Sequence, residues 1–179
     1  MAIQPIRLFG DPILATRAQE VDSFDKEIQR LVADLTDTML DAPGAGLAAP
    51  QIGVSLRVFT WAIEDEVGHL INPVLTLGEE EQEGDEGCLS IPKTMERPIR
   101  TIRAAKVVVQ TDNLGELTFQ INPEKDNNAD DDHKVSLETL QTVIVQHEID
   151  HINGKTTLEY LSRLKKEMAL KKVMKYYSS

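Results

Sequence analysis

The chain has 179 residues, of which 41% are hydrophobic and 27% are charged, as in an ordinary globular domain. No apolar run approaches the roughly 18–20 residues needed to cross a membrane, and the N-terminus lacks the basic and apolar segments of a secretory signal. Cys88 is the only cysteine, which rules out an internal disulfide. We therefore expect one domain over residues 1–179 that acts in the cytoplasm and does not bind membranes.

The net charge of −11 argues against DNA or other nucleic acid as a general partner, because phosphate backbones repel an acidic protein. The C-terminus differs from the rest, since six basic residues against one acidic residue give residues 161–179 a net charge of +5. The six are Arg163, Lys165, Lys166, Lys171, Lys172 and Lys175. This segment could dock on ribosomal RNA, or it could be a solvated helix that only packs on the domain.

The first element predicted is an amphipathic helix over about 23–41, with apolar residues at helical spacing. These residues are Phe24, Ile28, Leu31, Val32, Leu35 and Met39. Asp22 or Ser23 could cap the start of this helix, and Pro43 lies beyond its end. The next segment, GAGLAAPQIG, predicts a tight loop that another backbone can approach closely.

Segments rich in Val, Ile and Leu predict strands at 56–63, 70–77 and 104–111. The acidic segment 78–87 predicts a solvated loop, at least over its first half. The segment 122–135 contains three Asn and four Asp and predicts a surface loop. Its spacing does not match that of a calcium-binding loop.

Two further helices are predicted near the C-terminus. The first runs from Ser136, a plausible N-cap, to just before Gly154, which suits the position after a helix C-terminus. One face of this helix carries Leu137, Leu140, Ile144, His147 and His151. The second covers about 158–176, and its expected packing stripe is Leu161, Leu164 and Met168.

The most specific motif is His-Glu-x-x-His at positions 147–151. On a helix, His147 and His151 lie one turn apart and can bind the same metal ion. Glu148 then lies beside the ion, where it can take a proton from water. The competing interpretation is two core histidines that are satisfied by hydrogen bonds. Two imidazoles on an otherwise apolar face would be costly without such partners.

A catalytic metal site needs a third protein ligand, and the sequence offers several candidates. In the extended motif of some metallopeptidases the third ligand position corresponds to Thr157, which is a poor ligand. Glu159 lies close to His151, and Glu167 lies in the basic tail. Cys88 would be an excellent ligand as a thiolate, although a lone cysteine is more often a buried, inert thiol.

Three segments occur in a characteristic order: GAGLAAPQ at 44–51, EGCLS at 86–90 and QHEIDH at 146–151. Together they resemble the signature segments of peptide deformylases, and the early GDPIL and the long first helix fit as well. The resemblance implies a monomeric α+β fold in which antiparallel or mixed β-sheets pack around a central HExxH-bearing helix, with an N-terminal and a C-terminal helix. It implies metal-dependent removal of the formyl group from N-formylmethionine on nascent polypeptides.

The resemblance also implies particular site residues. Cys88, His147 and His151 would bind one ion per chain, Fe²⁺ in many members, with Zn²⁺, Ni²⁺ or Co²⁺ able to substitute. Glu148 would act as general base. The side-chain amide of Gln51 and the backbone N–H of Leu89 would stabilise the charge that develops on the formyl oxygen.

Substrate contacts are expected from two further sets of residues. Gly44, Ala45 and Gly46 would lie along the extended peptide, where larger side chains would obstruct its backbone. By resemblance Leu140, Val143 and Ile144 would surround the methionine side chain, although the same helical face must also pack in the core. Glu86 and Arg103 could support the metal ligands.

Two other functions remain open from the sequence. The first is an HExxH metallopeptidase that cleaves internal peptide bonds, against which the missing downstream third ligand argues. The second is a catalytically idle metal-binding or ribosome-docking protein of the same fold. Glu148 and Gln51 argue against an idle site, because binding of a metal requires neither of them.

Overall fold

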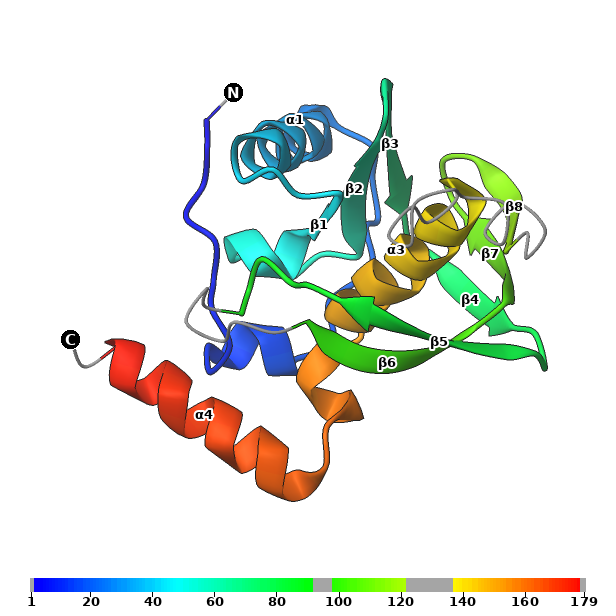
Figure 1. The fold of residues 1–179 in the computed structure, drawn as a ribbon. Helices are drawn as coiled ribbons and strands as arrows, with labels where there is room; N and C mark the ends of the chain where they lie inside the picture. Colours follow the sequence, from blue (N-terminus) through cyan, green and yellow to red (C-terminus); the bar gives the residue numbers. More distant parts are fainter. Residues whose placement is uncertain (1, 92–97, 122–136, 178–179) are drawn as a thin grey trace.

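The computed structural model describes residues 2–91, 98–121 and 137–177 of the chain (Figure 1). Three α-helices lie within this part: α1 (Lys26–Asp41), α3 (Leu137–Ile152) and α4 (Arg163–Tyr177). Its strands are β1 (Gly46–Ala48), β2 (Val58–Ile63), β3 (Glu66–Ile71), β4 (Val74–Leu77), β5 (Glu81–Glu86), β6 (Ile99–Ala104), β7 (Lys106–Thr111) and β8 (Gly115–Gln120). Short 3₁₀ helices cover Pro12–Ala15, Ala49–Ile52 and Thr157–Tyr160.

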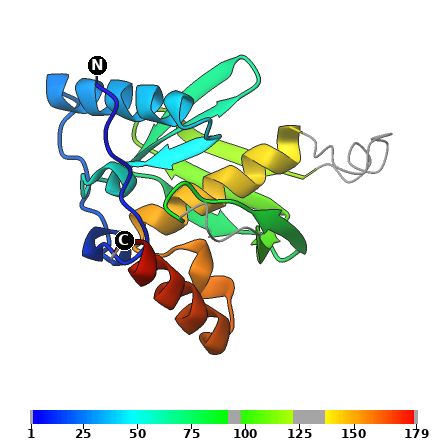
Figure 2. The same cartoon turned by 60° about the vertical axis from the view of Figure 1, so that its left-hand side comes forward.

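The strands form three small sheets whose neighbouring strands are all antiparallel. Their orders are β1-β2-β3, β4-β7-β8 and the β5-β6 hairpin. Helix α3 runs through the middle of the molecule, with α1 beyond the β1-β2-β3 sheet and α4 at the opposite end (Figures 1 and 2). The predicted α+β architecture around a central helix is confirmed.

Helix α3 is buried on nearly every side. Val145, Ile149 and Ile152 pack in one core with Phe59 of β2 and Val107 of β7. The described part of the same helix also buries six polar side chains, those of Thr139, Thr142, Gln146, His147, Glu148 and His151. Burial of so many polar groups costs free energy unless they are paired. Some of these side chains are therefore expected to serve a function other than packing.

The N-terminal predictions need two corrections. Helix α1 begins at Lys26 and its cap is Asp25, whose carboxylate accepts the backbone N–H groups of Glu27 and Ile28 at 2.9 and 3.1 Å. Phe24 therefore precedes the helix and is 52% exposed. The segment predicted as a loop at 44–53 contains strand β1 and a 3₁₀ helix, because Gly46–Ala48 pairs with the edge of β2.

The predicted strand at 70–77 is two strands in different sheets. β3 ends at Ile71, and Asn72 turns the chain with a left-handed φ of 49°, a conformation that Asn tolerates. The loop predicted for the first half of the acidic segment 78–87 is correct only for residues 78–80, because strand β5 begins at Glu81 and runs to Glu86. Its partner β6 supplies Arg100, which pairs with Glu83 and Asp85 and offsets part of the repulsion between their carboxylates.

The C-terminal segment also differs from its prediction. The single helix expected over 158–176 is a 3₁₀ turn followed by α4. Leu164 and Met168 are 68% and 56% exposed, whereas Ala169 and Val173 are buried. Small side chains let the helix approach the domain closely, and Leu161 just before it is the one residue of the expected stripe that packs there.

The end of the central helix agrees with its prediction. Gly154 follows α3 with a φ of +75°, the left-handed conformation that glycine adopts at this position. A Cβ there would also lie 2.9 Å from the backbone of Thr16, so the close approach of two chain segments requires glycine as well. The proposed N-cap Ser136 and the acidic segment 122–135 lie outside the described residues.

Candidate metal centre and catalytic cavity

Helix α3 presents two buried imidazoles on one side, one turn apart. His147 and His151 are 8% and 1% exposed, and their Nε2 atoms lie 3.2 Å from each other. The helix is fixed against strand β6 by Gln146, whose amide accepts the backbone N–H of Ala104 at 3.0 Å and donates to its carbonyl at 2.9 Å. Both histidines are therefore held by a rigid element on which a site can be built.

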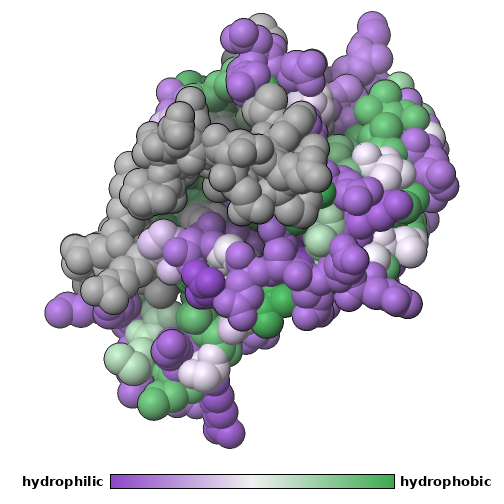
Figure 3. Space-filling view, turned by 45° about the vertical axis from the view of Figure 1, so that its right-hand side comes forward, coloured by the Kyte–Doolittle hydropathy of each residue, from purple (hydrophilic) through white to green (hydrophobic). Residues whose placement is uncertain are grey.

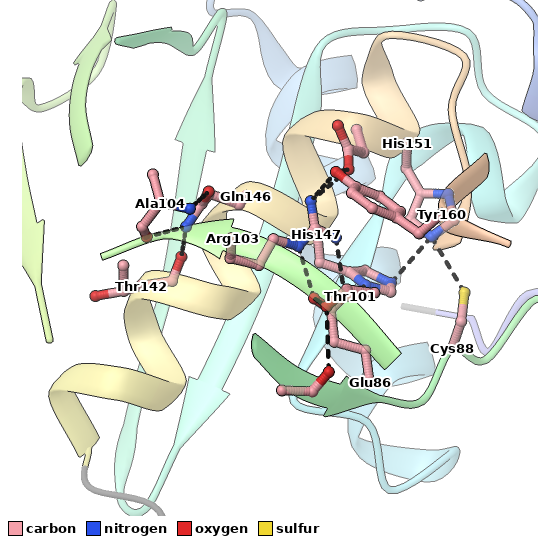
Figure 4. Close-up of polar contacts among 12 residues, drawn as sticks. Glu86, Cys88, Thr101, Arg103, Ala104, Thr142, Gln146, His147, His151 and Tyr160 are labelled. Carbon is pink, nitrogen blue, oxygen red and sulfur yellow. Dashed lines mark hydrogen bonds and ion pairs between the residues drawn. The ribbon is translucent and has the colours of Figure 1, made fainter. Parts of the chain in front are cut away.

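Cys88 reaches the two histidines from the end of strand β5. Its Sγ lies 3.2 Å from Nε2 of His151 (Figure 4). One ligand atom from each of Cys88, His147 and His151 falls within a group no wider than 4.8 Å. The structure thus places Cys88 beside the two histidines. The sequence alone, apart from the resemblance, left several candidates for this third ligand.

A buried ion pair lies behind His147. Glu86 accepts a hydrogen bond from Nδ1 of His147 at 2.7 Å, and Arg103 binds both oxygens of the Glu86 carboxylate at 2.6 and 2.8 Å (Figure 4). The hydroxyl of Thr101 donates to the same carboxylate at 2.6 Å. This carboxylate fixes the ring orientation of His147 and leaves its Nε2 turned toward Cys88 and His151.

Arg103 also contacts two residues that the sequence analysis did not single out, Asp150 and Tyr160. Its Nη1 donates to Asp150 at 2.5 Å and to the hydroxyl of Tyr160 at 2.7 Å. The guanidinium also lies over the ring of Tyr160, 4.7 Å from its centroid. Asp150 lies inside the HExxH segment. Tyr160 reaches Arg103 because of the 3₁₀ turn after α3, which no sequence pattern indicated.

The pKa values around the ion pair follow from burial and charge. Burial opposes ionisation of Glu86, but the hydrogen bonds from Arg103 and His147 prevail and lower its pKa to about 2. Burial also opposes protonation of both histidines. Contacts with Cys88 and Glu86 nevertheless raise the pKa of His147, whereas burial and the adjacent His147 lower the pKa of His151.

Glu148 lies beside the three residues and is only 3% exposed. Its Oε2 makes no hydrogen bond within the described part of the chain. Burial raises the pKa of its carboxyl group to about 7, with His147 opposing that rise. A buried carboxylate oxygen without a partner is the arrangement expected of a group whose partner is a reactant.

Gln51 is held by a hydrogen bond that fixes the direction of its amide. Its Oε1 accepts the backbone N–H of Ala48 at 2.8 Å, as a loop-capping amide would. The opposite end, Nε2, therefore points inward, where it donates to Ser90 Oγ at 3.1 Å and lies 3.9 Å from the sulfur of Cys88. The backbone N–H of Leu89 makes no hydrogen bond among the residues that the structure describes.

A cavity of about 460 Å³ opens onto these groups. All six residues expected to contact substrate line it, namely Gly44, Ala45, Gly46, Leu140, Val143 and Ile144. Gln51, Cys88, Leu89, His147 and Glu148 also line it. Of the expected site residues, His151 alone does not line the cavity; it is buried behind it, in contact with Cys88 and His147.

The donor set fits a divalent metal ion. Metal–nitrogen and metal–sulfur bonds of about 2.0–2.3 Å place the ligand atoms of a tetrahedral site roughly 3.3–3.6 Å apart. Two of the three separations, those from Nε2 of His151 to Cys88 Sγ and to His147 Nε2, are close to this at 3.2 Å, and all three atoms lie within 4.8 Å of one another. Three protein ligands leave a fourth position free for water or substrate, as in catalytic sites.

Comparison with known proteins agrees with this geometry. A family profile described as Polypeptide deformylase matches residues 3–167. The chain is 46% identical over 176 residues to a peptide deformylase of Acidothermus cellulolyticus, covering 97% of this chain and 87% of the relative. It is 42% identical over 178 residues to a peptide deformylase of Parafrankia sp., covering 97% and 86%.

The chain belongs to the peptide deformylase family. Its fold matches the crystal structure of a peptide deformylase from Legionella pneumophila with a TM-score of 0.78 and 38% identity, over 99% of this chain and 96% of that one. The actinonin complex of the peptide deformylase from Ehrlichia chaffeensis matches over the full length of both chains, with a TM-score of 0.81 and 29% identity. The predicted family and fold are confirmed.

Gly46 provides a test of how closely the segment 44–46 lies against the carboxylate of Glu148. A Cβ at this position would meet Oε1 of Glu148 and lie 2.9 Å from its Cδ. Gly46→Ala should therefore displace Glu148, lowering kcat/KM for a formylated peptide by at least tenfold and the free energy of unfolding by about 1–3 kcal/mol. An unchanged metal content, measured by mass spectrometry, would show that the ligands stay in place; unchanged kinetics would contradict the close approach.

Proposed function

We propose that the protein is a metal-dependent hydrolase that removes the N-formyl group from N-formylmethionyl peptides and releases formate. The observation that carries this proposal is the cluster of Cys88, His147 and His151 next to a cavity that Cys88, His147 and Glu148 line, in a chain of the deformylase family. We further propose that the enzyme acts as a monomer in the cytoplasm on nascent polypeptides. No helix among the described residues is long and apolar enough to span a membrane.

Cys88, His147 and His151 would hold one ion per chain, with Fe²⁺ the first candidate and Zn²⁺, Ni²⁺ or Co²⁺ as substitutes. Such an ion, when bound, supplies Lewis acidity and lowers the pKa of water at the site. The Cys88 thiolate reduces the net charge of the site, and a site with one sulfur and two imidazole nitrogens accepts several of these ions. The Glu86 carboxylate keeps His147 in the tautomer whose Nε2 is free to bind.

Glu148 would accept a proton from the attacking water and return it to the amine that leaves the formyl carbon. Gln51 Nε2 and the backbone N–H of Leu89 would donate hydrogen bonds to the formyl oxygen as negative charge develops there. Each such donor is typically worth about 2.7–4 kcal/mol in the transition state. The hydrogen bond from Ala48 to Gln51 Oε1 supports this role, because it turns the amide nitrogen toward the cavity in advance.

The substrate would lie with its backbone along Gly44, Ala45 and Gly46. A Cβ on Gly44 would lie 2.6 Å from Cδ1 of Leu89, so a side chain there would have to displace that of Leu89. The first side chain of the peptide would enter the part of the cavity lined by Leu140 and Val143. Apolar walls suit methionine, whose flexible thioether fills irregular pockets.

The test is the release of formate from formyl-Met-Ala-Ser by anaerobically purified protein loaded with Fe²⁺ or Ni²⁺. Mass spectrometry of the product separates the candidate functions. We expect loss of formyl alone, with the tripeptide otherwise intact. Cleavage of internal bonds would indicate a metallopeptidase, and an unchanged peptide with folded, metal-loaded protein would indicate an idle site.

We also propose that α4 docks on ribosomal RNA. Lys165, Lys171, Lys172 and Lys175 are exposed on this helix, among exposed apolar side chains. Hydrophilic and hydrophobic side chains are intermixed at the lowest part of the molecule (Figure 3). Clustered cations of this kind bind phosphate backbones in a salt-dependent manner.

Replacing these four lysines with glutamate should abolish co-sedimentation with ribosomes at low salt while leaving formate release from a short peptide unchanged. Charge reversal is preferable to deletion of the helix, because Ala169 and Val173 are part of the packed domain. The parent protein should lose binding progressively as salt rises. Equal co-sedimentation of parent and variant would refute the docking proposal.

A further inference from the structure

A second cavity of about 290 Å³ lies between the β5-β6 hairpin and the N-terminal half of α3. Four residues line both this cavity and the catalytic one, namely Asp85, Glu86, Leu140 and Val143. The two spaces are therefore neighbours, and the second continues the first along α3, away from the metal ligands. Whole ligand pockets have volumes of about 300–1,000 Å³. The second cavity is close to the lower end of this range and is much larger than a single methylene group needs.

Strand β5 owes this space to Gly84. Side chains alternate along the strand, so Gln82, Gly84 and Glu86 are the more buried positions while Glu83 and Asp85 are exposed. A Cβ on Gly84 would meet no heavy atom within 4 Å, and its φ lies outside the left-handed region. Neither backbone conformation nor close packing requires glycine here, so the consequence of the missing side chain is the open volume.

The walls of the two cavities suit an extended apolar side chain. Leu140 and Val143 line the junction between them. The cavity is also bordered by polar residues, namely Gln82, Glu83, Asp85, Glu86, Thr101, Arg103 and Thr139. Their charges do not demand a charged ligand, because Glu86 pairs with Arg103, and the exposed Glu83 and Asp85 pair with Arg100. An unbranched chain entering from the catalytic cavity would pass Leu140 and Val143 before it reached Gly84.

We propose that Gly84 is a specificity-determining residue that lets this enzyme accept first side chains longer than that of methionine. The proposal deepens the deformylase function proposed above and rests on it. The substrate class is N-formyl peptides whose first residue carries a long, unbranched, apolar side chain. A large residue at position 84 would close the passage and restrict the enzyme to side chains that fit in the catalytic cavity alone.

The test compares two substrates and two variants. Formyl-norleucyl-Ala-Ser has a first side chain as long as that of methionine, and formyl-2-aminooctanoyl-Ala-Ser has two more methylenes. For the parent we expect kcat/KM for the longer substrate to be at least one third of that for the shorter. In Gly84→Ile this ratio should fall at least tenfold. Glu81→Ile places the same side chain on an exposed position of β5 and should leave the ratio unchanged.

Other outcomes are also informative. A parent that discriminates more than tenfold against the longer substrate would overturn the proposal, as would equal ratios in Gly84→Ile and its control. If Gly84→Ile fails to fold by circular dichroism, Gly84→Ala serves instead, because its Cβ meets no neighbour. It should shift the ratio in the same direction by about threefold, and no shift would overturn the proposal. Absence of formate from both substrates would refute the deformylase function itself.

Discussion

Replacing Glu148 with alanine should reduce kcat/KM for formyl-Met-Ala-Ser by about 10²–10⁴-fold, the range that a positioned general acid–base supplies. The reason is that Glu148 is the one buried carboxylate at the cavity whose Oε2 is left without a partner among the described residues. Metal content should stay at one ion per chain, because the three proposed ligands are untouched. Formate release and metal analysis on the same preparation measure both quantities.

Glu148→Gln is the matched control for shape. It keeps the volume of the side chain and removes the ionisable group, so the loss of activity should be comparable. Its free energy of unfolding, measured in urea, should equal or exceed that of the parent, since the native carboxylate is buried and incompletely paired. Activity within threefold of the parent in both variants would contradict the assigned role.

The largest effect on stability is expected at Arg103. Arg103→Met would leave the buried carboxylate of Glu86 without its main partner and should lower the free energy of unfolding by about 3–5 kcal/mol. The position of His147 depends on the same carboxylate, so metal affinity should fall by about 10–100-fold. Urea denaturation of the metal-free protein and competition with a chelator measure the two effects separately.

Arg100→Met provides the control on the same strand. Arg100 also bridges two carboxylates, those of Glu83 and Asp85, but all three side chains are more than half exposed. Exposed pairs of this kind contribute about 0–1 kcal/mol, so the variant should remain close to the parent in stability and metal affinity. Equal losses in the two variants would mean that burial of the Glu86–Arg103 pair is not what makes it important.

The helical part of the fold was largely predictable because it depends on local periodicity. The spacing of His147 and His151 placed both rings on one side of a helix, and Gly154 marked its end. The strands β2 and β7 were also evident from their Val- and Ile-rich composition. These signals come from residues close in sequence, which is why they can be read before any tertiary contact is known.

Strand β5 and helix α4 show where local patterns fail. The acidic strand is stabilised by arginines about 17 residues away, and only pairing with β6 reveals them. In α4, Ala169 and Val173 were less conspicuous than the larger Leu164 and Met168, yet they pack because small side chains permit close approach. Tyr160 reaches Arg103 only through the turn after α3. Tertiary partners decide each of these cases.

The most direct test of the account is titration of metal-free protein with Ni²⁺, or with Fe²⁺ under anaerobic conditions, while formate release from formyl-Met-Ala-Ser is followed. Three converging ligands predict negligible activity without metal, a linear rise up to one ion per chain, and no increase beyond it. Cys88→Ala should lose this saturable response. Full activity of the metal-free protein, or a linear rise that continues to two ions per chain, would contradict the proposed centre.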